Sequence, residues 1–143
     1  ISTCPEERYF CSMNTAYQDL YTGLGYLFYS VAASDGRIPK AETGRLKELI
    51  ERHWLPYENS RDEFGTDAAY YIDIIFDYAV DQELPAEDAY SNFLEVHAEH
   101  KALFDDDLKR LVERTASGIA EAMAGVNKSE RAVLNRLHRF LRQ

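Results

Sequence analysis

The stretch YLFYSVAASDGRIPKAETGRLKELI, from Tyr26 to Ile50, decides the fold. Apolar residues in its first part recur at three- and four-residue spacing, which places them on one face of a helix. Gly36 can adopt the positive φ that ends a helix, and Asp35 tolerates the neighbouring turn. Pro39 suits the first position of a second helix, where Glu42 brings a carboxylate near unpaired backbone N–H groups. The stretch therefore predicts a helical hairpin with a polar elbow.

The same apolar spacing recurs along the rest of the chain. It predicts helices at residues 14–34, 39–54, 67–81, 85–104, 106–124 and from 127 to the end. Pro56 is expected to end the second of them, because proline removes a backbone hydrogen bond from a helix. The polar stretch after Pro56 is expected to form the longest loop. We therefore expect an all-α fold, a compact bundle of about six to seven helices.

The length of 143 residues fits one domain with a core of its own. The helical pattern begins directly after Met13. Residues 1–13 are therefore expected to be an N-terminal extension, and residues 14–143 a single helical domain. Both cysteines, Cys4 and Cys11, lie in the extension, where two free thiols and a small disulfide loop are both consistent with the sequence.

The charge of the chain limits its partners. A formal net charge of −9 and a pI near 4.9 argue against nucleic acid, whose phosphates require clustered Lys and Arg. The longest apolar run, from Gly23 to Ala33, is shorter than the roughly 20 residues of a transmembrane helix. The first residues do not resemble a secretory signal. We expect no transmembrane segment and a cytoplasmic location.

Two groups of carboxylates each allow a structural and a cation-binding interpretation. Asp73, Asp77 and Asp81 fall on one stripe of the third predicted helix, where a solvated acidic face is favoured over attraction of a cation or a basic partner. The run from Asp105 to Asp107 is expected to cap the fifth helix. Binding of a cation is again the alternative.

Two histidines lie one helical turn apart, with Glu95 and Glu99 beside them. His97 and His100 can in principle reach one ion, but zinc takes three or four protein ligands. The chain also lacks the Glu-x-x-His motif of di-iron bundles. His97 is in line with Phe93 and is therefore expected to be a partly buried packing residue.

The two ends of the chain share a weak internal repeat. IPKAETGRLKELI at residues 38–50 aligns without a gap with VNKSERAVLNRLH at residues 126–138. The alignment pairs Lys40 with Lys128 and Glu42 with Glu130. In each copy an apolar helix precedes a turn and an acid-capped helix, so the pattern indicates a duplicated hairpin.

The segment AASDGRIPKAE, from Ala32 to Glu42, followed by a leucine-patterned helix resembles the signature of the TerB-like domains, a family named after tellurite-resistance proteins. The resemblance implies a compact all-α fold with pseudo-twofold repeated helical hairpins. It further implies a bacterial stress-response or membrane-associated setting and no established enzymatic activity. Acidic residues at the hairpin elbows are the family's suspected metal or partner site.

Carried over to this chain, the resemblance implies a metal site at Asp35 and Glu42, with Glu130 in the second copy. Nothing between Ala122 and Asn127 corresponds to Asp35, so we expect one elbow site at most. The elbow also resembles the second half of a calcium-binding EF-hand loop. An EF-hand is excluded because Val31 and Ala33 would occupy its first and third ligand positions without offering oxygen. The alternative to a metal site is a turn residue at Asp35 and a helix-start carboxylate at Glu42.

No catalytic motif stands out, since the chain has neither a Gly-x-Ser-x-Gly elbow nor a glycine-rich phosphate loop. We expect a non-catalytic binding or regulatory module that meets a protein partner and needs no cofactor. The alternative is a stress protein that binds a divalent cation at the acidic elbow. A homodimer is a further alternative, because the ten tyrosines include Tyr9, Tyr57, Tyr70, Tyr78 and Tyr90, which cannot all be buried in a core of this size.

Overall fold

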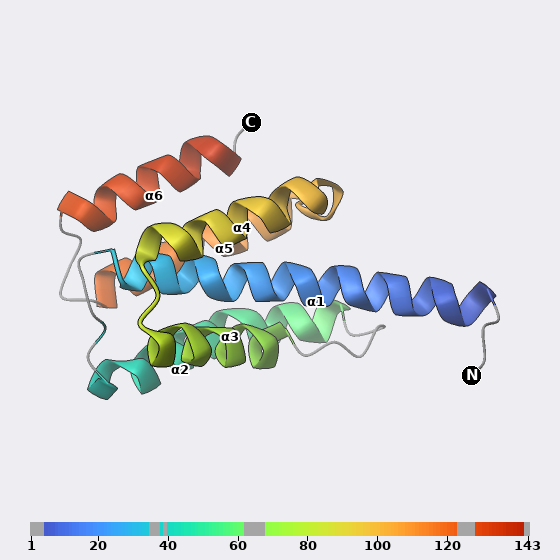
Figure 1. The fold of residues 1–143 in the computed structure, drawn as a ribbon, viewed down its shortest axis with the longest axis horizontal. Coiled ribbons are helices and arrows are strands. Elements are labelled where there is room, and N and C mark those ends of the chain that lie inside the picture. Colours follow the sequence, from blue (N-terminus) through green and yellow to red (C-terminus); the bar gives the residue numbers. More distant parts are fainter. Residues whose placement is uncertain (1–4, 35–37, 39, 62–67, 123–127, 142–143) are drawn as a thin grey trace.

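The computed structural model describes residues 5–34, 38, 40–61, 68–122 and 128–141. These residues form six α-helices and one short 3-10 helix, without a strand (Figure 1). The elements are α1 (Pro5–Ala32), α2 (Lys40–Arg61), α3 (Ala68–Gln82), α4 (Ala86–Glu99), η2 (Lys101–Leu103), α5 (Asp106–Ala122) and α6 (Lys128–Leu141). The prediction of an all-α fold is confirmed. None of the described helices combines the length and the apolar character needed to cross a membrane.

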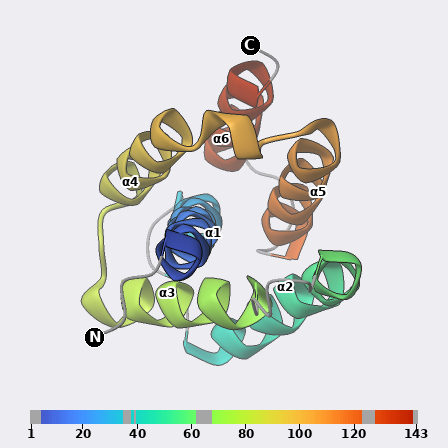
Figure 2. The ribbon, with the colours of Figure 1, turned by 90° about the vertical axis from the view of Figure 1, so that its right-hand side faces the viewer.

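Helix α1 is the central element of the bundle. It packs against α3, α4, α5 and α6, and Figure 2 shows it end-on with the other helices around it. Between Leu20 and Ala33 every residue except Thr22 and Tyr26 is buried. A helix enclosed on several sides must be apolar around most of its circumference. The apolar run in the sequence is therefore the buried centre of a helical bundle.

Two glycines of α1 allow neighbouring helices to approach closely. A Cβ atom on Gly23 would lie 2.8 Å from Cβ of Val96 in α4. A Cβ on Gly25 would lie 2.7 Å from Cβ of Ile75 and 3.0 Å from the backbone oxygen of Ile72, both in α3. The two carbon–carbon distances are shorter than normal carbon contacts. Residues 23 and 25 thus set the spacing of α1 from its two nearest neighbours.

Trp54 joins α2 to the core. Its side chain is fully buried and packs edge-on against Tyr21, with ring centroids 6.4 Å apart. The indole Nε1–H donates to Oγ1 of Thr115 in α5 at 3.1 Å, and that hydroxyl donates to the backbone oxygen of Leu111 at 2.8 Å. Both buried polar groups are therefore satisfied, as buried groups must be to avoid a desolvation cost.

Helix α6 packs against α5 and α1, and one of its arginines also contacts α4. The guanidinium of Arg136 contacts the Glu87 carboxylate, with a shortest distance of 3.1 Å, and lies 4.2 Å from the ring centroid of Tyr90. Tyr90 is buried, while Tyr70 and Tyr78 are exposed. The expectation that some tyrosines remain on the surface is confirmed, and Tyr90 is one that does not.

Three predicted boundaries are wrong. Helix α2 continues through Pro56 to Arg61, so the proline does not end it, and the expected loop is partly helical. A helix tolerates the loss of one backbone hydrogen bond when the turns on either side remain helical. Helix α4 ends at Glu99, and η2 replaces the predicted helix up to Phe104. Helix α1 begins at Pro5 and continues through Met13 without interruption.

The two copies of the internal repeat begin α2 and α6, since Lys40 and Lys128 are the first residues of those helices. Both copies are therefore helical as predicted. The turns before them, at residues 35–37, 39 and 123–127, lie outside the described residues. The pseudo-twofold pairing of hairpins remains a prediction.

Candidate functional site

The elbow residues predicted as a metal site stay untested. Asp35 lies outside the described residues. Glu42 and Glu130 lie near the beginnings of α2 and α6, as their helix-start positions predict, but their side chains are not among those described. The elbow therefore remains a prediction, and the sites below are built from other residues.

His97 in α4 and His100, which directly follows α4, contact different neighbours. His97 is 7% exposed, and its ring centroid lies 4.4 Å from that of Phe140 and 4.6 Å from that of Phe104. The prediction that His97 is a packing residue is confirmed. His100 instead faces Asp19 of α1, with its Nε2 atom 3.3 Å from Oδ2. The two imidazoles thus do not converge on one point.

His100 belongs to a cluster that can hold a metal ion. One ligand atom from each of Asp19, Glu99 and His100 lies within 4.8 Å of the others. Nε2 of His100 lies 3.8 Å from Oε2 of Glu99. One imidazole and two carboxylates suit zinc, which takes protein nitrogen and oxygen ligands at about 2.0–2.2 Å and accepts water as its fourth ligand. The same geometry also serves as a hydrogen bond between His100 and Asp19 at the end of α4.

Asp73 is not part of a solvated acidic face, contrary to the sequence-based prediction. Its Oδ1 atom is buried and has no hydrogen-bond partner in the part of the chain that the structure describes, and its carboxyl group lies against that of Glu51 in α2. Burial first, and then Glu51, raise the pKa of Asp73 to about 8, with a smaller opposing effect of Lys47. The neighbouring Asp77 pairs with Lys47 at 2.7 Å. Asp73 and Asp77 therefore face α2, whereas Asp81 is exposed.

Asp105 caps α5 as predicted. Its Oδ1 atom accepts a hydrogen bond from the backbone N–H of Leu108 at 2.8 Å. Asp106 and Asp107 occupy the first turn, where negative charge favours the helix dipole. Asp107 also pairs with Arg110 at 3.1 Å. Capping therefore accounts for this run of carboxylates.

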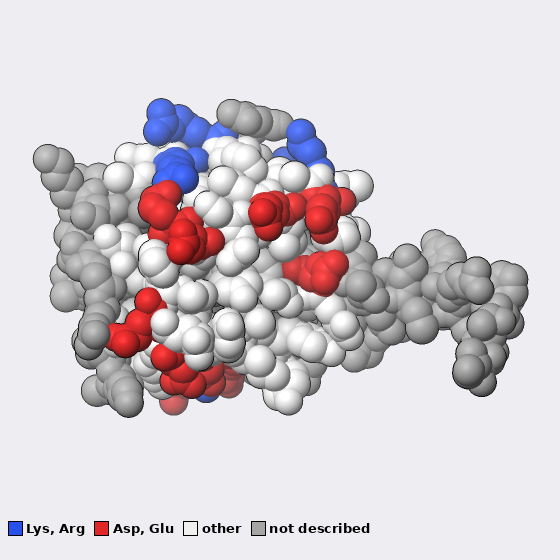
Figure 3. Space-filling view, viewed as in Figure 1, with Lys and Arg blue, Asp and Glu red and all other residues white. Residues whose placement is uncertain are grey.

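Helix α3 carries an exposed apolar surface. Tyr70, Ile74 and Tyr78 are 59%, 43% and 50% exposed, and their four-residue spacing places them in one row, here named the α3 stripe. Among the residues whose side chains the structure describes, no other large hydrophobic side chain is exposed. Figure 3 shows mainly uncharged surface over α3, with acidic groups along its edges and basic groups at the top, where α6 lies.

Part of the α3 stripe could be read from the sequence, and part could not. The number of tyrosines predicted that some would be exposed, and Tyr70 and Tyr78 were among those expected. Ile74 was missed, since it lies between the buried Ile72 and Phe76 in a helix with apolar residues around most of its circumference.

Comparisons of the chain with protein-family models, with curated proteins and with solved structures found no match. The function must therefore be inferred from the sites themselves.

Proposed function

We propose that this protein is a non-catalytic module that binds a protein partner through the α3 stripe, in a bacterial stress response of the TerB-like kind that the elbow motif resembles. The observation that carries the proposal is the row of Tyr70, Ile74 and Tyr78 on a helix whose other face is buried. Single exposed apolar side chains are common, but a contiguous row is typical of interaction surfaces. Tyrosine is also enriched in protein interfaces.

Charge indicates which kind of partner fits. Asp77 and Asp81 follow Ile74 and Tyr78 by three residues and are therefore their neighbours on the helix surface. Helix α3 contains no Lys or Arg. Asp77 is already paired with Lys47, but two copies of the α3 stripe would still bring their Asp81 carboxylates together, which disfavours the homodimer. We infer that the partner presents an apolar helical face with basic residues along its edges.

The test uses a synthetic amphipathic helical peptide with Leu and Phe along one face and lysines along both edges of that face. We expect saturable binding by calorimetry, and binding at least about tenfold weaker to Tyr70→Ser/Ile74→Ser/Tyr78→Ser. The variant should fold normally, because exposed substitutions change stability by only about 0.5 kcal/mol each. Ala102→Ser/Ala132→Ser, at exposed positions away from α3, is the matched control and should bind like the wild type.

A second peptide, with glutamate in place of every lysine, separates the contribution of charge to binding from that of apolar contact. It should bind at least about tenfold more weakly than the lysine peptide. Equal binding of the lysine peptide to the wild type and the triple variant would contradict the proposal. Concentration-dependent dimerisation that the triple variant abolishes would instead assign the α3 stripe to a second copy of this chain.

A second candidate function is binding of a divalent cation. We propose that it would occur at Asp19, Glu99 and His100, because their ligand atoms converge within 4.8 Å. All three side chains are partly solvent-exposed, which favours a site for reversible binding.

This second function predicts that Zn²⁺ raises the melting temperature of chelator-treated protein by a few degrees, since an ion bound only by the folded state stabilises it. His100→Ala should abolish the increase. His138→Ala is the matched control, because His138 is an exposed histidine that faces a single carboxylate, Glu113, at 3.3 Å. An equal increase in wild type and His100→Ala would assign the effect to zinc bound elsewhere.

A further inference from the structure

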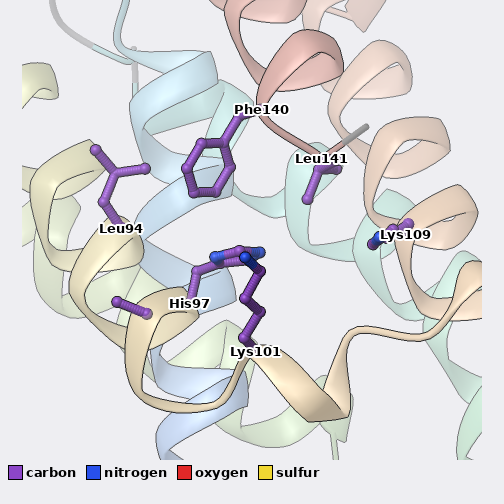
Figure 4. A pocket seen from close by; sticks show the side chains of 7 residues that line it. Leu94, His97, Lys101, Lys109, Phe140 and Leu141 are labelled. Carbon is purple, nitrogen blue, oxygen red and sulfur yellow. The ribbon is translucent and has the colours of Figure 1, made fainter. Parts of the chain in front are cut away.

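A cavity of about 430 Å³ lies where α4, η2, α5 and the end of α6 meet. Its main lining residues are Leu94, His97, Lys101, Lys109, Phe140 and Leu141 (Figure 4). The volume lies within the range of small-molecule sites, which extends from about 300 to 1,000 Å³. The cavity contains no residue of the α3 stripe, so a ligand there would serve a function separate from the proposed partner binding.

One wall of the cavity is apolar. Leu94, Phe140 and Leu141 supply aliphatic and aromatic surface. The ring of Phe140 is held against His97, and His97 against Phe104. Burial, together with the nearby charges of Lys101 and Lys109, lowers the pKa of His97, which favours the neutral imidazole at neutral pH. This wall therefore suits the apolar or aromatic body of a ligand.

The cavity is also lined by two positively charged side chains, those of Lys101 and Lys109. Lys101 follows α4 and Lys109 lies in α5, so the two approach from different elements. Figure 4 shows the amino group of Lys101 beside the His97 ring, with Lys109 on the far side of the cavity. No lining residue is acidic, and among the described residues neither amino group forms an ion pair. The positive charge of this cavity contrasts with the net charge of −9 of the whole chain.

We propose that this cavity binds a small organic carboxylate. The carboxylate lies between Lys101 and Lys109, and its apolar or aromatic body packs on Leu94 and Phe140. A carboxylate fits better than a phosphate ester because the site offers two point charges beside apolar walls. It has no arginine fork, and the first turn of α5 is already capped by Asp105. Lys109 is partly buried and Lys101 is exposed, so the ion pair with Lys109 is the one strengthened relative to a pair on the open surface.

The probe is 2-naphthoate, with the uncharged 2-naphthalenemethanol as its isosteric partner, and calorimetry or saturation-transfer NMR as the measurement. We expect naphthoate to bind in the millimolar range or tighter, and the alcohol at least about tenfold more weakly. Lys101→Gln/Lys109→Gln should weaken naphthoate binding at least about tenfold and leave binding of the alcohol unchanged. Raising the salt concentration should weaken the binding of naphthoate and leave the binding of the alcohol unchanged.

Arg110→Gln is the matched control, because it removes one positive charge next to Lys109 from a residue that does not line this cavity. It should change the affinity for naphthoate less than about twofold. Equal affinities for acid and alcohol, no saturable binding of naphthoate, or an unchanged affinity in the double lysine variant would overturn the proposal. Phenyl phosphate that binds more tightly than naphthoate would overturn the choice of a carboxylate. Melting curves of both variants verify that they remain folded.

Discussion

Replacing Gly25 with alanine is expected to lower the free energy of unfolding by roughly 1–3 kcal/mol, although alanine is the better helix former. The added Cβ would lie 2.7 Å from Cβ of Ile75 and 3.0 Å from the backbone oxygen of Ile72. Neither atom is the flexible end of a side chain, so α1 and α3 must move apart. Chemical denaturation followed by circular dichroism measures the change.

Gly44 provides the matched control, since it lies in a helix with nothing within 4 Å of an added Cβ. Gly44→Ala should raise the free energy of unfolding by about 0.5–1 kcal/mol through helix propensity alone. The same substitution is thus expected to lower the free energy of unfolding at position 25 and to raise it at position 44. Stabilisation by both would show that α3 does not approach α1 as closely as this packing requires.

Asp73 is expected to make the stability of the protein fall as the pH rises. Its folded-state pKa of about 8 lies above the ordinary 3.8, so the folded protein holds this proton more tightly than the unfolded chain. The stabilisation is complete below about pH 4 and is lost as the pH rises through about 8. Between about pH 5 and pH 9 the wild-type melting temperature should fall by roughly 5 °C relative to that of Asp73→Asn.

Asparagine has a similar shape and no proton to lose, so Asp73→Asn should have the flatter dependence of melting temperature on pH. Asp81→Asn is the control, because Asp81 is an exposed carboxylate on the same helix. Its curve should run parallel to that of the wild type. A curve for Asp73→Asn that is also parallel would mean that Glu51 and Asp73 do not share a buried environment.

The sequence predicts the inner faces of the helices well, because burial imposes a period on the apolar residues. The predicted ranges for α3, α5 and α6 lie close to those in the structure. Residues that usually interrupt a helix, such as proline and glycine, predict the ends of the helices less reliably. Pro56 lies inside α2, and the chain changes to η2 after His100 without a proline or glycine at that point. Packing against the central helix outweighs local preference at these positions.

Contacts between distant parts of the chain could not be predicted. His100 contacts Asp19, which is 81 positions away in the sequence. Only the folded chain therefore brings these two candidate zinc ligands together. Lys101 and Lys109 belong to no recognisable sequence motif. They line the same cavity only because η2 connects α4 to α5 in this arrangement. Asp73 was assigned to the wrong face because the spacing of carboxylates does not show which helix lies opposite them. Capping by Asp105 was predictable, since it depends on neighbouring residues alone.

The proposed function depends on the α3 stripe, and its most direct test is NMR mapping of the lysine-edged peptide on the isotope-labelled protein. Backbone amide shifts report contact residue by residue, without requiring any substitution. We expect the largest changes in α3, centred on Tyr70, Ile74 and Tyr78, with the amides around His97 unaffected. Largest changes in α4 to α6, or no changes at saturating peptide, would contradict the assignment of α3 as the binding surface.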